Sequence, residues 1–251
     1  LAGLVLAVNV AGDGLRDVVE PATGELLGRA AMAGRSRLAF EELFFVQLLQ
    51  LRAKELARER RAGITFANKR DLTSRLRERL SFQLTGAQTR AIREIFVDMC
   101  SDRRMHRLLQ GDVGSGKTIV ALFAALLAIE NGYQAAIMVP TELLAEQHVR
   151  TMTELLAPLG VEPILLTGSL PARERKTIAA RLASGEPVLV VGTHALVQEA
   201  TSFAKLGFAA IDEQHRFGVE QRKTLGAKGE APDILLMSAT PIPRSLALTL
   251  Y

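Results

Sequence analysis

Residues 108–118, LLQGDVGSGKT, decide the fold of this chain, because they join an apolar strand to an apolar helix through a glycine-rich turn. The spacing Gly111-x-x-x-x-Gly116-Lys117-Thr118 is the phosphate-binding loop pattern. Such a loop bends tightly and points successive backbone N–H groups inward, where a Cβ atom would collide with a bound phosphate. The stretch therefore predicts a nucleotide site where a strand passes into a helix.

The side chains that close this loop suit a nucleoside triphosphate with a magnesium ion. Lys117 would reach the β- and γ-phosphates, the Thr118 hydroxyl would ligate Mg²⁺, and the helix N-terminus adds the positive end of its dipole. A glycine-rich turn that binds nothing is the alternative, and the strand and helix on either side argue against it. We expect ATP to be bound by Gly111, Asp112, Val113, Gly114, Ser115, Gly116, Lys117 and Thr118.

The composition is that of a globular protein with room for one large α/β domain and an accessory segment. Of 251 residues, 48% are apolar and 23% are charged, which is ordinary for a domain with a packed core. No apolar run reaches the ~18 residues that a membrane-spanning helix requires. The single cysteine, Cys100, excludes a disulfide framework and suits a reducing compartment. We therefore expect a cytoplasmic protein without a membrane partner.

Positive charge is concentrated just before the phosphate-binding loop. Residues 52–79 hold ten Lys/Arg against four Asp/Glu, a larger surplus than the net charge of +4 for the whole chain. Such a block could follow the phosphates of a nucleic acid, and it could equally be the solvated face of a helix. The sequence leaves both interpretations open.

Three segments are expected along the chain. Residues 1–34 show no clear periodicity and stay unassigned, with the remnant of an upstream domain as one interpretation. An apolar stripe at helical spacing predicts a mainly helical, basic linker over 35–80, including a short helix at about 71–80. Residues 81–251 form the nucleotide-binding domain. Because the chain lacks an initiator Met and stops soon after its last motif, we expect a fragment of a longer protein.

After the loop, apolar strands alternate with helices. The strand runs are continuous rather than alternating in polarity, so both faces of the sheet are expected to be covered. That pattern is typical of an α/β domain with a doubly wound parallel sheet, the RecA-like fold of P-loop NTPases. The predicted helices are 119–131, 142–159 and 171–184, and the predicted strands are 135–139, 162–167, 187–193, 208–212 and 233–238.

Ahead of the loop, the stretch FQLTGAQ (82–88) leads into an amphipathic helix that runs to about Met99. Thr85 can cap that helix. A primary amide can donate to and accept from the adenine edge at once, and an aromatic ring can stack on the base. Because they stand ahead of a phosphate-binding loop, Gln88 and Phe82 are expected to bind the adenine.

In an open parallel sheet, ligands bind outside the carboxyl ends of the strands, and polar clusters fall there in this sequence. The strand FAAI is followed by Asp212, Glu213, Gln214 and His215. Asp212 suits a second Mg²⁺ anchor, and Glu213 suits a catalytic base that orients or deprotonates the attacking water. Gln214 and His215 could contact the γ-phosphate, whereas no Cys/His partners support His215 as a metal ligand. An Asp–Glu pair that merely ends a strand is the alternative.

Other strand ends carry small polar residues. The last strand runs into SATPIPR, where Ser238 and Thr240 can hydrogen-bond the Asp–Glu loop and report the nucleotide state. Three further junctions, at 140–142, 167–169 and 192–194, offer hydroxyls, backbone N–H groups or a helix start that can hold the phosphates of a polymer. Each alone is an ordinary helix cap, and the three together form a candidate track.

Taken together, these motifs resemble those of superfamily 2 helicases, and within them the first motor lobe of the RecG family of branched-DNA translocases. The resemblance covers about residues 80–251, and the helical run 38–43 is similar to the segment that precedes the motor. The motor of the transcription–repair coupling factor is also similar, but it usually has Glu in place of Gln214. The stretches that carry the resemblance are FQLTGAQ (82–88), GDVGSGKT (111–118), VPTELLAEQH (139–148), LLTGS (165–169), VVGTHALVQ (190–198), IDEQHRFGVEQR (211–222) and MSATPIPR (237–244).

The resemblance implies ATP- and Mg²⁺-dependent movement on duplex DNA, with reversal of stalled forks and branch migration of Holliday junctions in repair and recombination. It also implies a monomer that binds branched DNA and contacts a single-stranded-DNA-binding protein. Ser238 and Thr240 would couple hydrolysis to movement. The residues implied to face the DNA are Pro140, Thr141, Thr167, Gly168, Thr193 and His194.

Two other functions fit part of the sequence. A small-molecule P-loop kinase would share the loop, but it does not need the Asp-Glu-Gln-His and Ser-Ala-Thr runs, and it would show an arginine-rich lid. A nucleotide- and DNA-binding module without turnover is the second alternative. A single lobe lacks the second motor lobe, whose arginine fingers are expected to complete the ATP site.

Overall fold

A computed structural model describes residues 63–213, 224–226, 228–229 and 231–239, together with residues 34, 37, 40, 41, 44, 45, 47–49, 51 and 52. The chain divides into two compact units, one built mainly from residues 1–56 and the other mainly from residues 57–247. Residues 1–33 and 53–62 lie outside the described part, as do Gln214, His215 and Thr240. The predictions that fall on them therefore stay predictions.

In the first unit, every described residue between 34 and 52 is helical, as the apolar stripe predicts. Arg37 and Glu41 form an ion pair, with 3.0 Å between Nε and Oε1. The rings of Phe40 and Phe44 stack with their centroids 5.9 Å apart. Both pairs have the four-residue spacing that brings side chains together on the surface of a helix.

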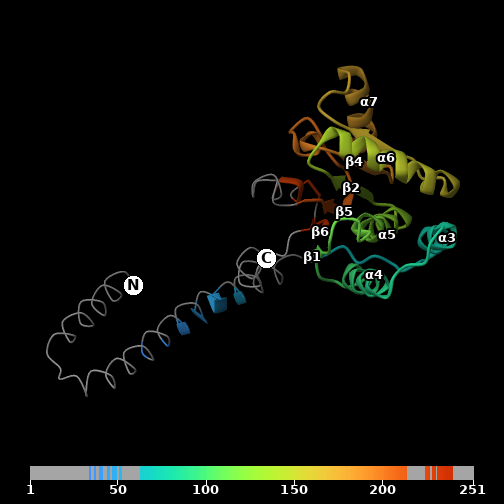
Figure 1. Cartoon of the computed structure of the whole chain (residues 1–251). Helices are drawn as coiled ribbons and strands as arrows, with labels where there is room; N and C mark the ends of the chain where they lie inside the picture. Colours follow the sequence, from blue (N-terminus) through green and yellow to red (C-terminus); the bar gives the residue numbers. More distant parts are fainter. Residues whose placement is uncertain are drawn as a thin grey trace, which may run out of the picture. The chain divides into compact units, whose positions relative to one another are not determined.

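The second unit is built on a six-stranded sheet in the order β1-β6-β5-β2-β4-β3 (Figure 1). Every neighbouring pair is parallel, so the carboxyl ends of all strands meet at one edge. The strands are β1 (His106–Gln110), β2 (Gln134–Met138), β3 (Pro163–Leu166), β4 (Leu189–Gly192), β5 (Leu206–Ile211) and β6 (Asp233–Ser238).

Helices connect these strands and cover the sheet. The α-helices are α3 (Asp71–Arg79), α4 (Gly86–Met99), α5 (Lys117–Glu130), α6 (Glu142–Leu156) and α7 (Ala172–Ala183), and the short 3₁₀ helices are η1 (Ala157–Leu159) and η2 (His194–Val197).

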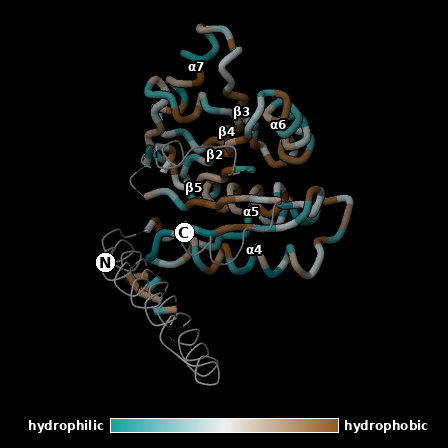
Figure 2. The backbone as a smooth tube through the Cα atoms, turned by 60° about the vertical axis from the view of Figure 1, so that its left-hand side comes forward, coloured by the Kyte–Doolittle hydropathy of each residue, from teal (hydrophilic) through white to brown (hydrophobic). Residues whose placement is uncertain are grey.

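Successive strand residues pack into two separate cores, one on each face of the sheet. Ile137 and Val191 pack with residues of α3, α4, α5 and α6. Their neighbours Met138 and Val190 pack instead with Leu182 of α7 and with η2. Hydrophobic residues run along α5 and the strands beside it (Figure 2). Because both faces are covered, the strands are apolar throughout, and the prediction of a doubly wound parallel sheet is confirmed.

Two boundaries in the structure differ from those predicted from the sequence. The helix predicted over 142–159 is α6 followed by η1, because Pro158 has no N–H to continue the α-helical ladder. Leu76 of α3, predicted to belong to the linker, is fully buried in the same core as α5. The short helix at 71–80 thus packs on the sheet-containing unit.

Within the described residues, no helix combines the length and the apolar character that crossing a bilayer requires.

Candidate functional site

The phosphate-binding loop has the backbone that its glycines permit. Gly114 and Gly116 adopt φ angles of 81° and 80°, in the left-handed region that side chains other than glycine avoid. A Cβ atom on Gly116 would also lie 2.4 Å from Nε2 of Gln88. Position 116 therefore requires glycine, both because of its backbone conformation and because Gln88 of α4 approaches it closely.

Lys117 is held at the mouth of this loop. Its Nζ donates to the carbonyl oxygens of Gly111 at 2.6 Å and Asp112 at 2.8 Å. No side chain caps the start of α5, so the helix N-terminus keeps backbone donors for an anion. The cradle of backbone N–H groups, the ammonium group and the Thr118 hydroxyl fit a polyphosphate.

Gln88 ties α4 to the loop. Its Oε1 accepts from the Thr85 N–H at 2.9 Å, and its Nε2 donates to the Ser115 carbonyl oxygen at 2.9 Å. Thr85 accepts in return from the Gln88 N–H, which completes a capping box at the start of α4. Gln88 therefore has a capping role besides the predicted adenine contact, and the spacing of a Thr and a Gln three residues apart is the sequence signal of this cap.

Gln88 and Phe82 can both still contact adenine in this arrangement. A primary amide has two donor hydrogens and two acceptor lone pairs, so one of each is left after the two intramolecular bonds. The Phe82 side chain is 49% exposed, so its ring is accessible to a base. Adenine recognition by this pair stays a prediction.

Asp212 and Glu213 follow the carboxyl end of β5. The Asp212 N–H donates to the Met138 carbonyl oxygen at 2.9 Å, which holds Asp212 beside the end of β2. Asp212 Oδ1 accepts from the Glu213 N–H at 2.9 Å. Glu213 has a φ angle of 45°, a left-handed conformation that costs about 1–3 kcal/mol in a residue other than glycine and is found mostly at functional sites.

Ser238 ends β6, the strand between β1 and β5. Ser238 pairs in register with Gln110 of β1, and the Ser238 carbonyl oxygen accepts from the Gly111 N–H at 3.2 Å. The sequence predicted a coupling role for the Ser238 side chain. The backbone link to the phosphate-binding loop could not be seen in the sequence, because it depends on strand order.

Mg²⁺ is implied by the loop pattern, and the residues present fit it. Within the described residues, no group of three or more His, Cys, Asp or Glu side chains could hold a metal by itself. Mg²⁺ is bound in nucleotide sites through one or two carboxylates together with the substrate phosphates. The predicted pair, the Thr118 hydroxyl and the Asp212 carboxylate, has that donor chemistry.

On the other half of the same edge, three turns predicted as a track come together around Glu142 of α6. Glu142 Oε1 accepts from the N–H groups of Gly168 at 2.9 Å and Ser169 at 3.2 Å. A Cβ atom on Gly168 would lie 3.7 Å from the His194 ring, so His194 borders the same turn. These hydrogen bonds, led by that of the Ser169 side chain, lower the pKa of Glu142.

The remaining residues of the predicted track differ in exposure. The Thr141 side chain is exposed and accepts from the Leu144 N–H at 3.3 Å, so it caps α6. Thr167 and Thr193 are buried, at 1% and 2% exposed. The Thr167 hydroxyl bonds the Ser169 hydroxyl at 3.1 Å, and the Thr193 hydroxyl has no partner among the described residues. Both threonines therefore lie beneath the exposed surface of their turns. Pro140, which is half-buried, directly precedes the capping Thr141.

His148 of α6 is a feature that sequence reasoning missed. Burial lowers its pKa, and the negative charge of Asp212 acts against that shift. His148 is thus within electrostatic reach of the Asp212 carboxylate, although the two residues are far apart in the sequence.

Comparisons with known proteins agree with this geometry. Residues 85–249 match the family model described as DEAD/DEAH box helicase. The ATP-dependent DNA helicases RecG of Streptococcus pneumoniae and Bacillus subtilis are each 48% identical to this chain, over 86% and 94% of its length. The chain spans only 32% and 34% of those two relatives.

A structure of RecG bound to a three-way DNA junction is 48% identical and superposes with a TM-score of 0.75, over 86% of this chain and 29% of that one. The helicase MrfA, bound to DNA and AMPPNP, shares the fold at 17% identity with a TM-score of 0.53. The family match over residues 85–249 and the 48% identities show that the chain belongs to the DEAD/DEAH box helicases, as a motor domain of the RecG type.

Proposed function

We propose that this chain is the ATP-binding motor lobe of an enzyme that moves along double-stranded DNA and remodels branched DNA. Its work would be the reversal of stalled forks and the branch migration of Holliday junctions in repair and recombination. One observation supports the proposal: a single sheet edge carries the phosphate-binding loop after β1, beside β6 and β5, and three polar turns after β2, β4 and β3. A change in one half can therefore be transmitted to the other through a rigid sheet.

In the ATP half, the residues of the loop hold the triphosphate. Lys117 neutralises the β- and γ-phosphates, and the uncapped start of α5 adds its backbone N–H groups. Thr118 and Asp212 hold Mg²⁺, which when bound neutralises charge on the phosphate oxygens. Glu213 orients and deprotonates the attacking water, while Gln214 and His215 contact the γ-phosphate.

In the DNA half, the three turns bind backbone phosphates. Exposed Thr141 and His194 donate directly, and the Gly168 N–H belongs to a turn shaped by Glu142. Phosphate contacts of this kind position a protein on DNA without reading its sequence. The six residues proposed to line the track are Pro140, Thr141, Thr167, Gly168, Thr193 and His194.

Ser238 and Thr240 couple the two halves. Ser238 lies on the strand between the loop strand and the Asp212 strand, and its carbonyl oxygen already bonds the first glycine of the loop. If the loop moved when the γ-phosphate is lost, the end of β6 would therefore be displaced first.

The substrate class comes from the relatives. The relatives at 48% identity are named ATP-dependent DNA helicases, and the related solved structure holds a three-way DNA junction. We extend branched DNA, a monomeric state, a cytoplasmic location and contact with a single-stranded-DNA-binding protein to this chain. Residues 81–251 are assigned to the motor lobe and 35–80 to a basic helical segment before it.

The test is ATP hydrolysis by the intact protein, alone and with forked duplex or single-stranded DNA, beside a direct ATP-binding titration. We expect ATP binding that depends on Mg²⁺ and turnover stimulated more by forked duplex than by single strands. ATP binding with no stimulation by any DNA would contradict the motor assignment. Absence of ATP binding would contradict the nucleotide site itself.

A further inference from the structure

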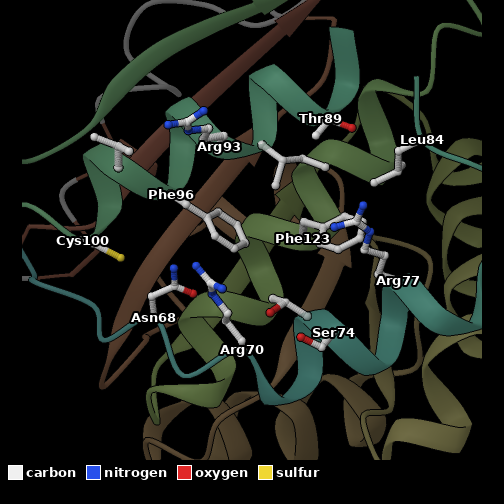
Figure 3. A pocket seen from close by; sticks show the side chains of 13 residues that line it. Asn68, Arg70, Ser74, Arg77, Leu84, Thr89, Arg93, Phe96, Cys100 and Phe123 are labelled. Atoms are coloured by element: carbon white, nitrogen blue, oxygen red, sulfur yellow. The ribbon is translucent and has the colours of Figure 1, made fainter. Parts of the chain in front are cut away.

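A second cleft lies between α3 and α4, away from the phosphate-binding loop (Figure 3). It has a volume of about 520 Å³, within the range of about 300–1,000 Å³ that is usual for small-molecule sites. It extends along α4 from Thr89 to Cys100, about 16 Å at 1.5 Å per residue. No residue of 111–118 lines it, so it is distinct from the ATP site.

The lining combines three arginines with an apolar wall and contains no carboxylate. Arg70 comes from the turn before α3, Arg77 from α3 and Arg93 from α4, and all three are exposed to solvent. The side chains of these arginines have no hydrogen-bond or ion-pair partner among the described residues. The apolar wall is formed by Leu84, Ile92, Phe96 and Phe123, and Figure 3 shows the Phe96 ring between the arginines.

Two carboxylates on the helix that carries Arg93, and the Glu130 carboxylate beside Arg70, are engaged elsewhere. Glu94 and Asp98, on the same helix as Arg93, both bind the guanidinium of Arg107. Glu130 accepts from the backbone N–H groups of Arg70 and Leu72, at 3.2 and 3.1 Å. Among the described residues, no carboxylate forms an ion pair with any of the three cleft arginines.

The backbone at Arg70 is strained, which gives an independent indication of function. Arg70 has a φ angle of 60° and a ψ angle of 22°, a conformation that Gly or Asn adopts at lower cost. Glu130 holds this conformation from one side, and Asn131 bonds the backbone N–H and carbonyl of Ala67, both at 2.9 Å. In Figure 3 the Arg70 side chain extends toward Phe96, so the strained turn delivers a guanidinium into the cleft.

We propose that this cleft binds a phosphorylated organic anion of nucleotide size. Guanidinium groups form bidentate hydrogen bonds with phosphate, and an aromatic ring can stack on a nucleotide base. A cleft of about 520 Å³ has room for one such ligand, whereas a duplex presents a continuous backbone. Two of the three arginines belong to the basic block at 52–79, whose role the ATP and DNA sites do not explain.

A ligand here would bridge α3 and α4 and reach the first turn of α4. Thr89 lines the cleft, and its neighbour Gln88 holds the phosphate-binding loop through Ser115. Occupancy of the cleft is therefore expected to change the affinity of the loop for ATP.

The test is a titration of the intact protein with adenosine 3′,5′-bisphosphate while a non-hydrolysable ATP analogue saturates the loop. We expect one further equivalent to bind, and the double variant Arg77→Ala/Arg93→Ala to weaken that binding at least tenfold. The matched control is Arg79→Ala/Arg90→Ala, which removes the same charge from the same two helices outside the cleft lining. No further equivalent, or an equal loss in both double variants, would overturn the proposal.

A third variant, Arg70→Asn, separates a binding role from a structural one. Asn tolerates the left-handed conformation, so the variant should unfold at the same or a higher denaturant concentration while losing affinity for the bisphosphate. Unchanged affinity would overturn the role of Arg70. If a short duplex displaced the probe and the Arg77/Arg93 variant lost duplex affinity equally, the cleft would be a DNA contact and the nucleotide assignment would fail. All readouts are binding or stability, so they do not depend on helicase turnover.

Discussion

At the scale of single residues, Lys117 is the side chain on which nucleotide chemistry depends most. It supplies the positive charge of the loop and also holds the loop through two backbone carbonyl oxygens. We expect Lys117→Ala to lower the ATP turnover number at least a hundredfold, the usual cost of removing one donor from developing phosphate charge. Steady-state ATPase rates with saturating forked duplex measure this, and a rate within tenfold of the wild type would refute the site.

Glu213 allows binding and chemistry to be separated. Glu213 follows Asp212 directly and has a left-handed backbone conformation. Its N–H donates to the Asp212 carboxylate. Glu213→Gln keeps the size of the side chain and the backbone bond but removes the base. ATP affinity should stay within about threefold while hydrolysis falls by about 10²–10⁴. A large loss of ATP affinity, measured by titration, would show that Glu213 holds the ligand instead.

At the scale of elements, the turn after β3 depends on a side chain from α6. Glu142→Ala would leave the N–H groups of Gly168 and Ser169 without their acceptor, so the turn should lose its shape. Because the track would lose an ordered turn, affinity for forked DNA should fall roughly tenfold. Fluorescence anisotropy measures this, with exposed Glu146→Ala on the same helix as the control. Equal affinities of the two variants would exclude the turn from the DNA track.

At the scale of the whole molecule, Asp233 makes folding stability depend on pH. It lies at the start of β6, where Oδ1 accepts from the Met105 N–H at 2.6 Å and Oδ2 has no partner among the described residues. Burial, opposed by the Met105 hydrogen bond and the charge of Arg104, raises its pKa from 3.8 to about 8. Between these values the unfolded chain releases a proton that the folded chain keeps.

The sign of the effect follows from that difference. Stability from the protonated Asp233 is complete below about pH 4 and is lost as the pH rises toward 8, by up to about 1.4 kcal/mol per pH unit. Asp233→Asn, which keeps an acceptor for Met105, should flatten this slope and unfold at higher urea concentration than the wild type at pH 8. Urea unfolding at several pH values tests it, with exposed Asp102→Asn as the control. Parallel slopes for all three proteins would disprove the role of Asp233.

Local patterns predicted most elements of this molecule. The helix of 71–80 and the helix capped by Thr85 are present, and each strand named after the loop appears within two residues of its predicted ends. These features depend on short-range periodicity and on caps, which neighbouring residues determine. The end of α6 differed because Pro158 has a strictly local effect that we had given too little weight.

Hydrogen bonds between distant parts of the chain could not be predicted from such local patterns. Glu142 with Gly168, Gln88 with Ser115 and Ser238 with Gly111 join residues separated by 26 or more positions. The cleft of Arg70, Arg77 and Arg93 arises only because α3 and α4 both pack on α5 and leave a space between them. Nothing in a linear pattern marks such pairs, since each residue on its own fits an ordinary loop or an exposed helix face.

The sequence by itself identified the loop glycines, Lys117, the parallel strands and the acidic strand end, because each is a local pattern of neighbouring residues. Only the tertiary structure decided that β6 separates the loop strand from the Asp212 strand and that the Glu142 carboxylate of α6 accepts from the turn after β3. It alone decided which arginines are neutralised by carboxylates and which are not. The physical reason is that strand order and helix docking are set by burial summed over the whole core, while hydrogen bonds and charge pairing follow from the proximity that burial creates.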